Sequence, residues 1–243
     1  MSQTKKPLSR RGFLKSGGVA ALAGVAASAA PSRAVAVQRT PLPRRWDTTV
    51  DVLIVGTGFA GLTAAVEARA AGAGVLVLDK MPVHGGNSII NGGDFAAAGN
   101  SLQREAGVQD SPDQMLKDML KAGSNLNHPV LARIVAERSN EALEWTKSFV
   151  GAEYKRLNYH GGHAVKRSVQ TVTASGGELV NKLLAKALQL GANVELRTKL
   201  VRLVTADDGR VLGAEVRRGY DYPDDASGTR AFIRARRAVV LAS

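Results

Sequence analysis

The sequence contains no cysteine among its 243 residues. Disulfide bonds, iron–sulfur clusters, cysteine zinc sites and haem attached through a CxxCH motif are therefore excluded. Aromatic residues are also few, at 5% of the chain, whereas the apolar fraction of 44% is ordinary. A chain of this length and apolar content is expected to form one sizeable domain with ample core.

Acidic residues are missing from residues 1–46, which hold nine of the 33 lysine and arginine residues. The formal net charge of +12 therefore belongs mostly to the N-terminal segment, and the remainder of the chain is only weakly basic. This distribution argues against a basic face that binds nucleic acid.

Long apolar runs are missing too, because residues 17–30 form a short stretch rich in alanine and glycine that cannot stably span a bilayer. The run Ser9-Arg10-Arg11-Gly12-Phe13-Leu14-Lys15 before it matches the twin-arginine export pattern. Small residues at 27–29 and 34–36 are candidate cleavage sites, of which we favour the second. We therefore expect a periplasmic or otherwise exported protein. The alternative is a disordered basic N-terminus.

The domain organisation follows from these boundaries. We expect residues 1–36 to be the twin-arginine signal peptide and residues 37–48, which contain two prolines, to be a linker. Residues 49–243 are expected to form a single domain.

A nucleotide-binding pattern begins with the apolar run Val50–Val55, which leads into Gly56-Thr57-Gly58-Phe59-Ala60-Gly61. An alanine-rich helical segment follows to about Ala71, and a second apolar run, Val75–Leu78, ends on Asp79. Strand, glycine turn, helix, strand and acid come in the order of a dinucleotide-binding βαβ unit. A glycine-rich turn of an unrelated α/β domain is disfavoured, because the strand, turn, helix, second strand and acid all occur in the expected order and spacing.

Each residue type in this unit predicts a contact. Gly56 permits a tight turn, Gly58 lets a pyrophosphate approach the backbone, and Gly61 lets the helix pack closely on the strand. The helix N-terminus, which includes Ala60, offers N–H groups and a positive dipole end to a phosphate. Asp79 is placed to accept hydrogen bonds from ribose hydroxyls.

A second glycine-rich stretch follows as Lys80-Met81-Pro82-Val83-His84-Gly85-Gly86-Asn87-Ser88-Ile89-Ile90-Asn91-Gly92-Gly93. A plain NAD-binding unit does not need this loop, whereas a longer dinucleotide has a second side that such a loop can wrap. The stretch therefore favours FAD and adds six candidate contacts: Lys80, Gly86, Asn87, Ser88, Gly92 and Gly93.

With this loop in place, the sequence resembles the FAD-dependent fumarate reductase/succinate dehydrogenase flavoprotein family, and most of all its soluble flavocytochrome c-type branch. The resemblance covers nearly all of the chain after residue 48. It is carried by the runs DKMPVHGGNSIINGG, DSPDQMLKDMLKAG, NEALEWTKSF, GGHAVKR and DDGRVLGAEV. It implies an α/β fold, namely a Rossmann-like FAD-binding domain with a parallel sheet and an added β-meander.

The resemblance also carries expectations about the cofactor. Membrane-bound relatives attach FAD covalently through a histidine whose matching position here is Asn87, so we expect non-covalent FAD. In the family, backbone near Leu200 meets the adenine ring. No metal site is predicted.

The expected chemistry is hydride transfer between flavin and an unsaturated/saturated acid pair. A small-molecule substrate is expected, a dicarboxylate or another unsaturated acid, with electrons from a separate electron-transfer protein. One alternative is a ketosteroid-type dehydrogenase of the same fold. Another is a non-catalytic FAD-binding fragment that requires a partner chain.

Catalytic groups are harder to place. In relatives a loop similar to Gly161–Arg167 runs toward the substrate, so His163 and Arg167 are candidates, although two solvated histidines in an exposed loop are the alternative. A further histidine common in the family is replaced by Val169 or Gln170, which weakens any role in proton transfer. The family's catalytic arginine and carboxylate-binding residues lie beyond the equivalent of Ser243. We therefore expect a chain truncated before the substrate-clamping domain.

The remaining pattern predicts several elements. A short helix is expected from residues 95–98, a helix capped by Ser111 and ending at Gly123, and another opened by Pro129 with Leu131, Ile134 and Val135 facing inward. Ser175 is expected to cap a helix that ends at Gly191. Residues 200–205 and 211–217 form a predicted hairpin, followed by a strand at 232–235 and a separate buried parallel strand at 238–243.

Overall fold

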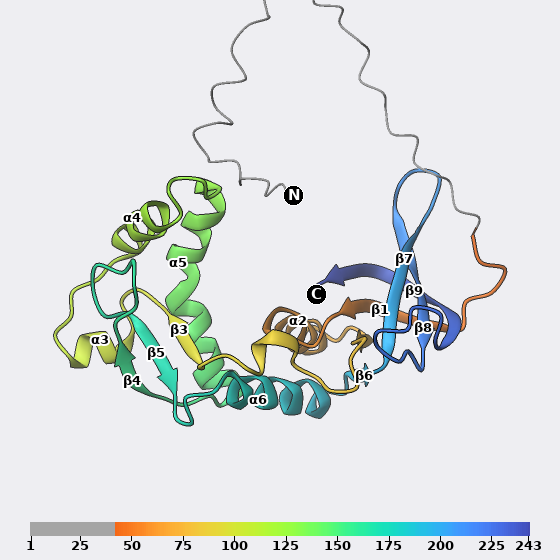
Figure 1. Cartoon of the computed structure of the whole chain (residues 1–243), viewed down its shortest axis with the longest axis horizontal. Helices are drawn as coiled ribbons and strands as arrows, with labels where there is room; N and C mark the ends of the chain where they lie inside the picture. The colour runs from red at the N-terminus through yellow and green to blue at the C-terminus, as the bar shows by residue number, and fades with distance from the viewer. Residues whose placement is uncertain (1–41) are drawn as a thin grey trace, which may run out of the picture. The chain divides into compact units, whose positions relative to one another are not determined.

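The computed structural model describes residues 42–243, so the predicted signal peptide and its cleavage sites lie outside the described residues. The described part is an α/β domain with two sheets (Figure 1). The larger sheet has six strands in the order β6-β2-β1-β9-β8-β7, and the smaller has three in the order β3-β5-β4. The predicted α/β fold with a parallel sheet and a β-meander is confirmed. No helix within residues 42–243 is long and apolar enough to cross a membrane.

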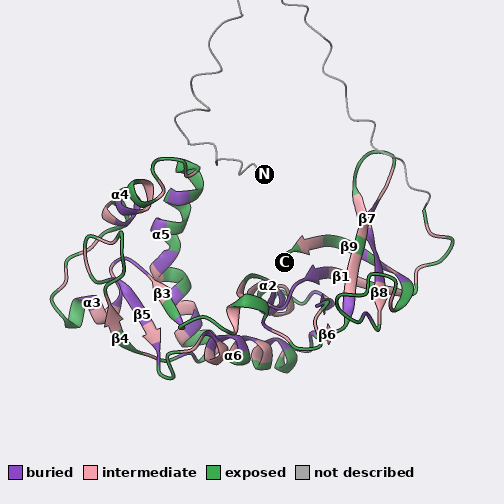
Figure 2. Ribbon diagram, in the orientation of Figure 1, coloured by how far each residue is buried: buried purple, intermediate pink, exposed green. Residues whose placement is uncertain are grey.

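The parallel part of the large sheet comprises β1 (Thr48–Val55), β2 (Val75–Leu78), β6 (Asn193–Glu195) and β9 (Thr229–Leu241). The predicted strand–helix–strand unit is confirmed by β1, α2 (Phe59–Ala70) and β2. Helices α2 and α6 (Gly176–Gln189) pack on each other and on one face of this sheet. Figure 2 shows the end of β1 as buried, whereas β6 and the end of β9 are intermediate or exposed.

The meander consists of β7 (Thr198–Thr205), β8 (Val211–Arg218) and the first half of β9, paired antiparallel. The predicted hairpin is confirmed, but the prediction of two separate strands after it is wrong. β9 is a single 13-residue strand that pairs with β8 over residues 229–234 and with β1 over residues 233–241. Arg236 and Arg237, which break the apolar pattern, lie outside the core and face the Asp51 carboxylate. The end of β9 is not buried as predicted, since Leu241 is 58% exposed.

The small sheet corrects another prediction. Residues Asp94–Ala96 form β3, not the start of a helix, and pair with β5 (Ser168–Thr171), which also pairs with β4 (Tyr154–Asn158). The helix begins later, as α3 (Ser101–Glu105), behind a capping box made by Asn100 and Gln103. Local pattern missed β3 because its partner strand lies more than 70 positions further along the chain.

Helices α4 (Pro112–Ala122) and α5 (Pro129–Trp145) pack on each other, and α5 continues as one π-helical turn over Thr146–Val150. Ser111 caps α4 as predicted, accepting from the Gln114 N–H at 3.1 Å. The predicted inward face of α5 is wrong, because Leu131, Ile134 and Val135 are 59%, 51% and 53% exposed. The buried stripe consists of Ala132, Ala136, Ser139 and Leu143, and its members that pack against Met115 and Leu116 of α4 are the small residues Ala132 and Ala136. The close packing on α4 is therefore made by small side chains, which an apolarity pattern ranks below leucine and isoleucine.

Candidate functional site

Thr57 joins the two glycine loops at the ends of β1 and β2. Its side chain is fully buried, and its hydroxyl donates to Asp79 Oδ2 while accepting from the Gly85 N–H at 2.9 Å. The Thr57 N–H donates to the same Asp79 Oδ2 at 3.0 Å, and the Met81 N–H donates to Oδ1 at 3.0 Å. The Asp79 carboxylate thus fixes both loops, which goes beyond the role that the sequence suggested for it.

The second loop is also fixed at its far end. The Ser88 hydroxyl, in the short 3₁₀ helix η1 (Gly86–Ser88), accepts from the Phe59 N–H at 3.1 Å, the first residue of α2. The Asn91 side chain donates to the Ser88 carbonyl at 2.6 Å and accepts from the Gly93 N–H at 2.7 Å. The Gly176 N–H, at the start of α6, donates to the Asn91 carbonyl at 2.8 Å. The loop is therefore anchored to both helices that cover the sheet.

Glycine is required at the contact between the turn and α2. A Cβ at Gly61 would collide with the carbonyl oxygen of Gly56, and a Cβ at Gly56 would collide with the backbone of Ala242. Gly56 also has a φ of +110°, which disfavours other residues. A Cβ at Gly58 would lie 3.0 Å from Ser88 Oγ, so this glycine keeps the two loops in contact.

The N-terminus of α2 is chemically suited to an anion. Gly58 occupies the N-cap and provides no side-chain hydrogen bond, and no acidic residue lies in the first turn. N–H groups of a helix's first turn lack partners within the helix and lie at the positive end of its dipole. Ala60, the second residue of α2, is exposed. The structure thus presents a helix terminus of the kind that binds phosphate.

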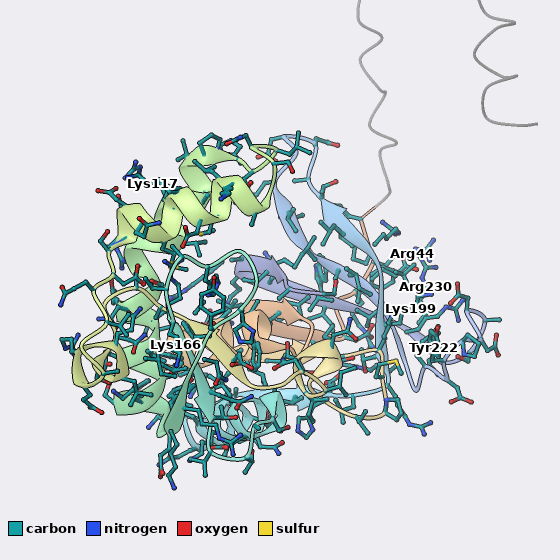
Figure 3. All side chains as sticks on the ribbon, turned by 60° about the vertical axis from the view of Figure 1, so that its left-hand side comes forward. Arg44, Lys117, Lys166, Lys199, Tyr222 and Arg230 are labelled. Carbon is teal, nitrogen blue, oxygen red and sulfur yellow. The ribbon has the colours of Figure 1, made fainter. Side chains whose placement is uncertain are left out.

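The other predicted cofactor residues fall into two groups. Gly86, Asn87 and Gly92 are exposed in the second loop, whereas Gly93 is buried against Thr171 and Ser175. Two lie elsewhere: Lys80 is exposed beside Tyr222, with its Nζ 5.7 Å from the ring centroid, and Leu200 is half-buried against the core of the meander. Figure 3 labels Tyr222 and Lys199, both on the meander side. Sequence reasoning missed Thr57, whose only signal is a hydroxyl residue inside the glycine turn.

Arg167 is fully buried in ion pairs. Its Nε and Nη2 donate to the two carboxylate oxygens of Asp110, each at 3.0 Å, and Nη1 lies 2.8 Å from Asp118 Oδ2. Both side chains of the Arg167–Asp110 pair are 0% exposed. The neighbouring Lys166, labelled in Figure 3, is exposed instead. This geometry gives Arg167 a structural role in holding the loop before β5.

His163 is partly buried beside this pair. Burial, followed by the nearby Arg167 charge, lowers the pKa of His163 below its ordinary value of 6.5, so the neutral form is favoured near pH 7. Its Nδ1 is buried without a hydrogen-bond partner. The other histidine of the loop, His160, contacts Asp94 instead. The two histidines are therefore in different environments, contrary to the reading of two solvated side chains.

A scan against known families gives a match to the FAD binding domain over residues 51–243. The chain belongs to this FAD-binding family. It is 42% identical to the acrylate reductase flavoprotein subunit of Shewanella woodyi, over 98% of this chain and 46% of that protein. The chain therefore spans less than half the length of that relative.

Solved structures of this FAD-binding family have the same fold. The open conformation of a flavocytochrome c3 fumarate reductase matches with a TM-score of 0.74 and 35% identity, over 81% of this chain and 34% of that one. A 3-ketosteroid dehydrogenase from Rhodococcus jostii matches with a TM-score of 0.73 and 30% identity, over 82% of this chain and 46% of that one. The protein is thus a flavoprotein whose cofactor is FAD and whose relatives are fumarate and acrylate reductases and related dehydrogenases.

Loss of the Thr57 hydroxyl is expected to weaken FAD binding. In Thr57→Val, the Gly85 N–H keeps its place in a buried site without an acceptor, and an unsatisfied buried donor costs about 1–3 kcal/mol. If the FAD-bound form bears that cost and the apoprotein does not, the FAD Kd rises about 5- to 150-fold. Fluorescence titration of the apoprotein with FAD measures the change. Thr57→Ser keeps the hydroxyl and should bind nearly as the wild type does; equal losses in both variants would contradict the role given to the hydroxyl.

Proposed function

We propose that the two glycine loops hold the ADP half of FAD. The pyrophosphate lies at the N-terminus of α2, against Gly58, Ala60 and Gly61, and Asp79 lies toward the ribose. The observation that supports this proposal is the set of hydrogen bonds by which Thr57 and Asp79 join the two loops. These bonds hold both sides of the site in a fixed arrangement. Lys80, Gly86, Asn87, Ser88, Gly92 and Gly93 continue the contact along the second loop, and Leu200 lies toward the adenine.

The activity we propose is reduction of an unsaturated acid. FAD held by the two glycine loops would supply a hydride from its reduced form to the C=C bond of the acid, and an acidic group of the protein would supply the proton. The described residues of the two glycine loops bind and orient the cofactor. In this proposal His163 and Arg167 hold the loop before β5 in place. Neither of them is proposed to deliver the proton.

Electrons are proposed to reach the flavin from a separate electron-transfer protein, since the chain has no cysteine for a covalent haem or an iron–sulfur cluster. Residues 1–36 are proposed to direct export through the twin-arginine pathway to the periplasm. Residues 37–48 then link that peptide to the FAD-binding domain of residues 49–243.

The test of the proposed function is flavin retention followed by reoxidation. Protein without residues 1–36 is incubated with FAD, desalted and examined for visible flavin absorption, then reduced with dithionite and mixed anaerobically with unsaturated acids. Retained flavin that an acid reoxidises supports the proposal. A colourless protein contradicts the cofactor site, and retained flavin that no acid reoxidises contradicts the activity.

A ketosteroid dehydrogenase of the same fold is the second candidate, favoured by the similarity to the Rhodococcus jostii enzyme. A steroid that reoxidises or reduces the bound flavin faster than any acid would favour it. A non-catalytic FAD-binding unit that needs a partner chain is the third candidate. Activity that appears only when a second chain is added would favour that one.

FAD is proposed to be bound without a covalent bond, because Asn87 provides no imidazole in the exposed second loop. Acid precipitation of the holoprotein should therefore release all of the flavin to the supernatant. Flavin that stays with the precipitated chain and co-migrates with it on a denaturing gel would contradict this prediction.

A further inference from the structure

Asn91 is followed by Gly92 in the second glycine loop, and no other asparagine in the sequence precedes a glycine. Both residues are exposed. The backbone nitrogen that follows an asparagine can attack the carbon of the side-chain amide, and glycine allows this most readily because it has no Cβ to obstruct the approach. The pair is therefore chemically suited to spontaneous deamidation.

The loop holds the Asn91 amide close to the nitrogen that would attack it. Asn91 Oδ1 accepts from the Gly93 N–H at 2.7 Å, so the side chain folds back along the backbone of Gly92. The same hydrogen bond draws electrons from the amide carbon and would stabilise the negative charge that develops on Oδ1 during attack. Among the hydrogen bonds of residues 42–243, none has the Gly92 N–H as its donor. This nitrogen can therefore react without first losing an acceptor.

The Asn91 amide also ties the loop together. Its Nδ2 donates to the Ser88 carbonyl at 2.6 Å, and the Ser88 hydroxyl in turn accepts from the Phe59 N–H at the start of α2. A Cβ at Gly176 would lie 2.5 Å from Asn91 Nδ2, so the amide fits tightly against the first residue of α6. An ionised carboxylate in its place has no proton to donate. Its oxygen would face the Ser88 carbonyl oxygen across the same short distance and repel it.

We propose that Asn91 deamidates spontaneously and that the modified loop binds FAD less tightly. In the first step the Gly92 nitrogen bonds to Asn91 Cγ, the Cγ–Nδ2 bond breaks, and ammonia leaves with the proton that the Gly92 nitrogen gave up. Water then opens the cyclic imide at either carbonyl, which gives aspartate or isoaspartate. Nothing is oxidised or reduced, and water is the only co-reactant. The effect on FAD rests on the proposed function, whereas the deamidation does not.

Both products disturb the loop at the same place. Aspartate loses the hydrogen bond to Ser88, whereas isoaspartate also lengthens the backbone by a methylene group before Gly92. The lengthened chain cannot keep Gly93 where it is, because this residue is packed so closely that a Cβ would lie 2.3 Å from Thr171 Oγ1. The FAD contacts proposed for Ser88, Gly92 and Gly93 are therefore weakened together.

The first experiment locates the modification without using FAD. The full chain is incubated at mildly acidic and at alkaline pH, digested with trypsin, and compared with unincubated protein by tandem mass spectrometry of the peptide that covers residues 81–104. Conversion at Asn91 should be faster at alkaline pH, because the Gly92 nitrogen attacks after losing its proton. Gly92→Ala should slow it about tenfold, since the added Cβ obstructs the approach. That Cβ meets side chains only, the nearest atom at 3.3 Å, so the variant should fold.

The same peptide contains two comparison sites, Asn87 and Asn100, each followed by serine. Asn100 is 0% exposed and its Nδ2 donates to two backbone carbonyls, so Asn91 should convert about tenfold faster or more. Asn87 is exposed like Asn91, and it should also convert more slowly because serine carries a Cβ. Equal conversion at Asn87 and Asn91, or no slowing in Gly92→Ala, would overturn the assignment of this site.

The second experiment measures the consequence for the cofactor. Deamidated protein is separated from unmodified protein by its added negative charge on an ion-exchange column, and both forms are titrated with FAD. The modified form and Asn91→Asp should each bind FAD about tenfold more weakly. Asn193→Asp adds the same charge at the exposed start of β6 and should bind FAD as the wild type does. Unchanged affinity in both the modified form and Asn91→Asp would overturn this consequence, whereas freshly prepared protein that binds no FAD would overturn the proposed function.

Discussion

Gly61→Ala is expected to abolish stable FAD binding. The added Cβ would collide with the carbonyl oxygen of Gly56, which is backbone and cannot rotate away. Either α2 moves away from the turn or the turn itself opens. In both cases the N-terminus of the helix no longer faces the position proposed for the pyrophosphate. Forcing one extra carbon into a packed site typically costs about 1–3 kcal/mol of folding stability. A displacement that costs FAD binding about 2.7 kcal/mol raises its Kd about 100-fold.

The measurement is an FAD titration together with a urea denaturation curve of the apoprotein. Gly161→Ala provides the matched control, because a Cβ there meets nothing within 4 Å and the backbone is not left-handed. That variant should match the wild type in both assays. If Gly61→Ala also bound FAD with wild-type affinity, the close contact between α2 and the turn would not be needed for the site.

Arg167→Met is expected to cause the largest loss of folding stability among single substitutions outside the glycine loops. The change removes the cation that two buried carboxylates share, and Asp110 is left 0% exposed without its partner. Removing one member of a buried ion pair typically costs about 3–5 kcal/mol, because the remaining charge is no longer compensated. The midpoint of urea denaturation of the FAD-saturated protein should fall accordingly.

The control is Arg138→Met, which breaks an ion pair with Glu141 on the exposed surface of α5. Exposed pairs contribute about 0–1 kcal/mol, so this variant should stay close to the wild type. The contrast between the two Arg→Met variants separates burial from the mere loss of a positive charge. Equal losses in both would contradict the structural role of Arg167.

Local pattern was sufficient where an element's neighbours are close in sequence. The βαβ unit was predicted because strand, turn and helix all lie between residues 48 and 79, and each leaves its own periodic signal. The caps at Ser111 and Ser175 were predicted for the same reason, since each cap bonds within three residues. β3 was missed because its only support, β5, is distant along the chain.

Side-chain size misled the prediction for α5. Leu131, Ile134 and Val135 are apolar and lie near one another on the helix, yet the buried stripe is made of Ala132, Ala136 and Ser139. Which stripe is buried depends on how closely α4 approaches, and the sequence of α5 alone does not contain that distance. The Thr57 contacts were missed similarly, because they depend on where Gly85 returns in space.

The position of β9 has a consequence for synthesis of the chain on the ribosome. β9 is made after the other five strands of the large sheet, yet it lies between β1 and β8 and pairs with both. β1 is made about 185 positions earlier, and on that side it has no partner until residues 229–241 follow. Pairing over such a distance in sequence is slow compared with local pairing. The edge of β1 on that side therefore stays unpaired while residues 56–228 are made, and an unpaired apolar strand edge is prone to aggregation during that interval.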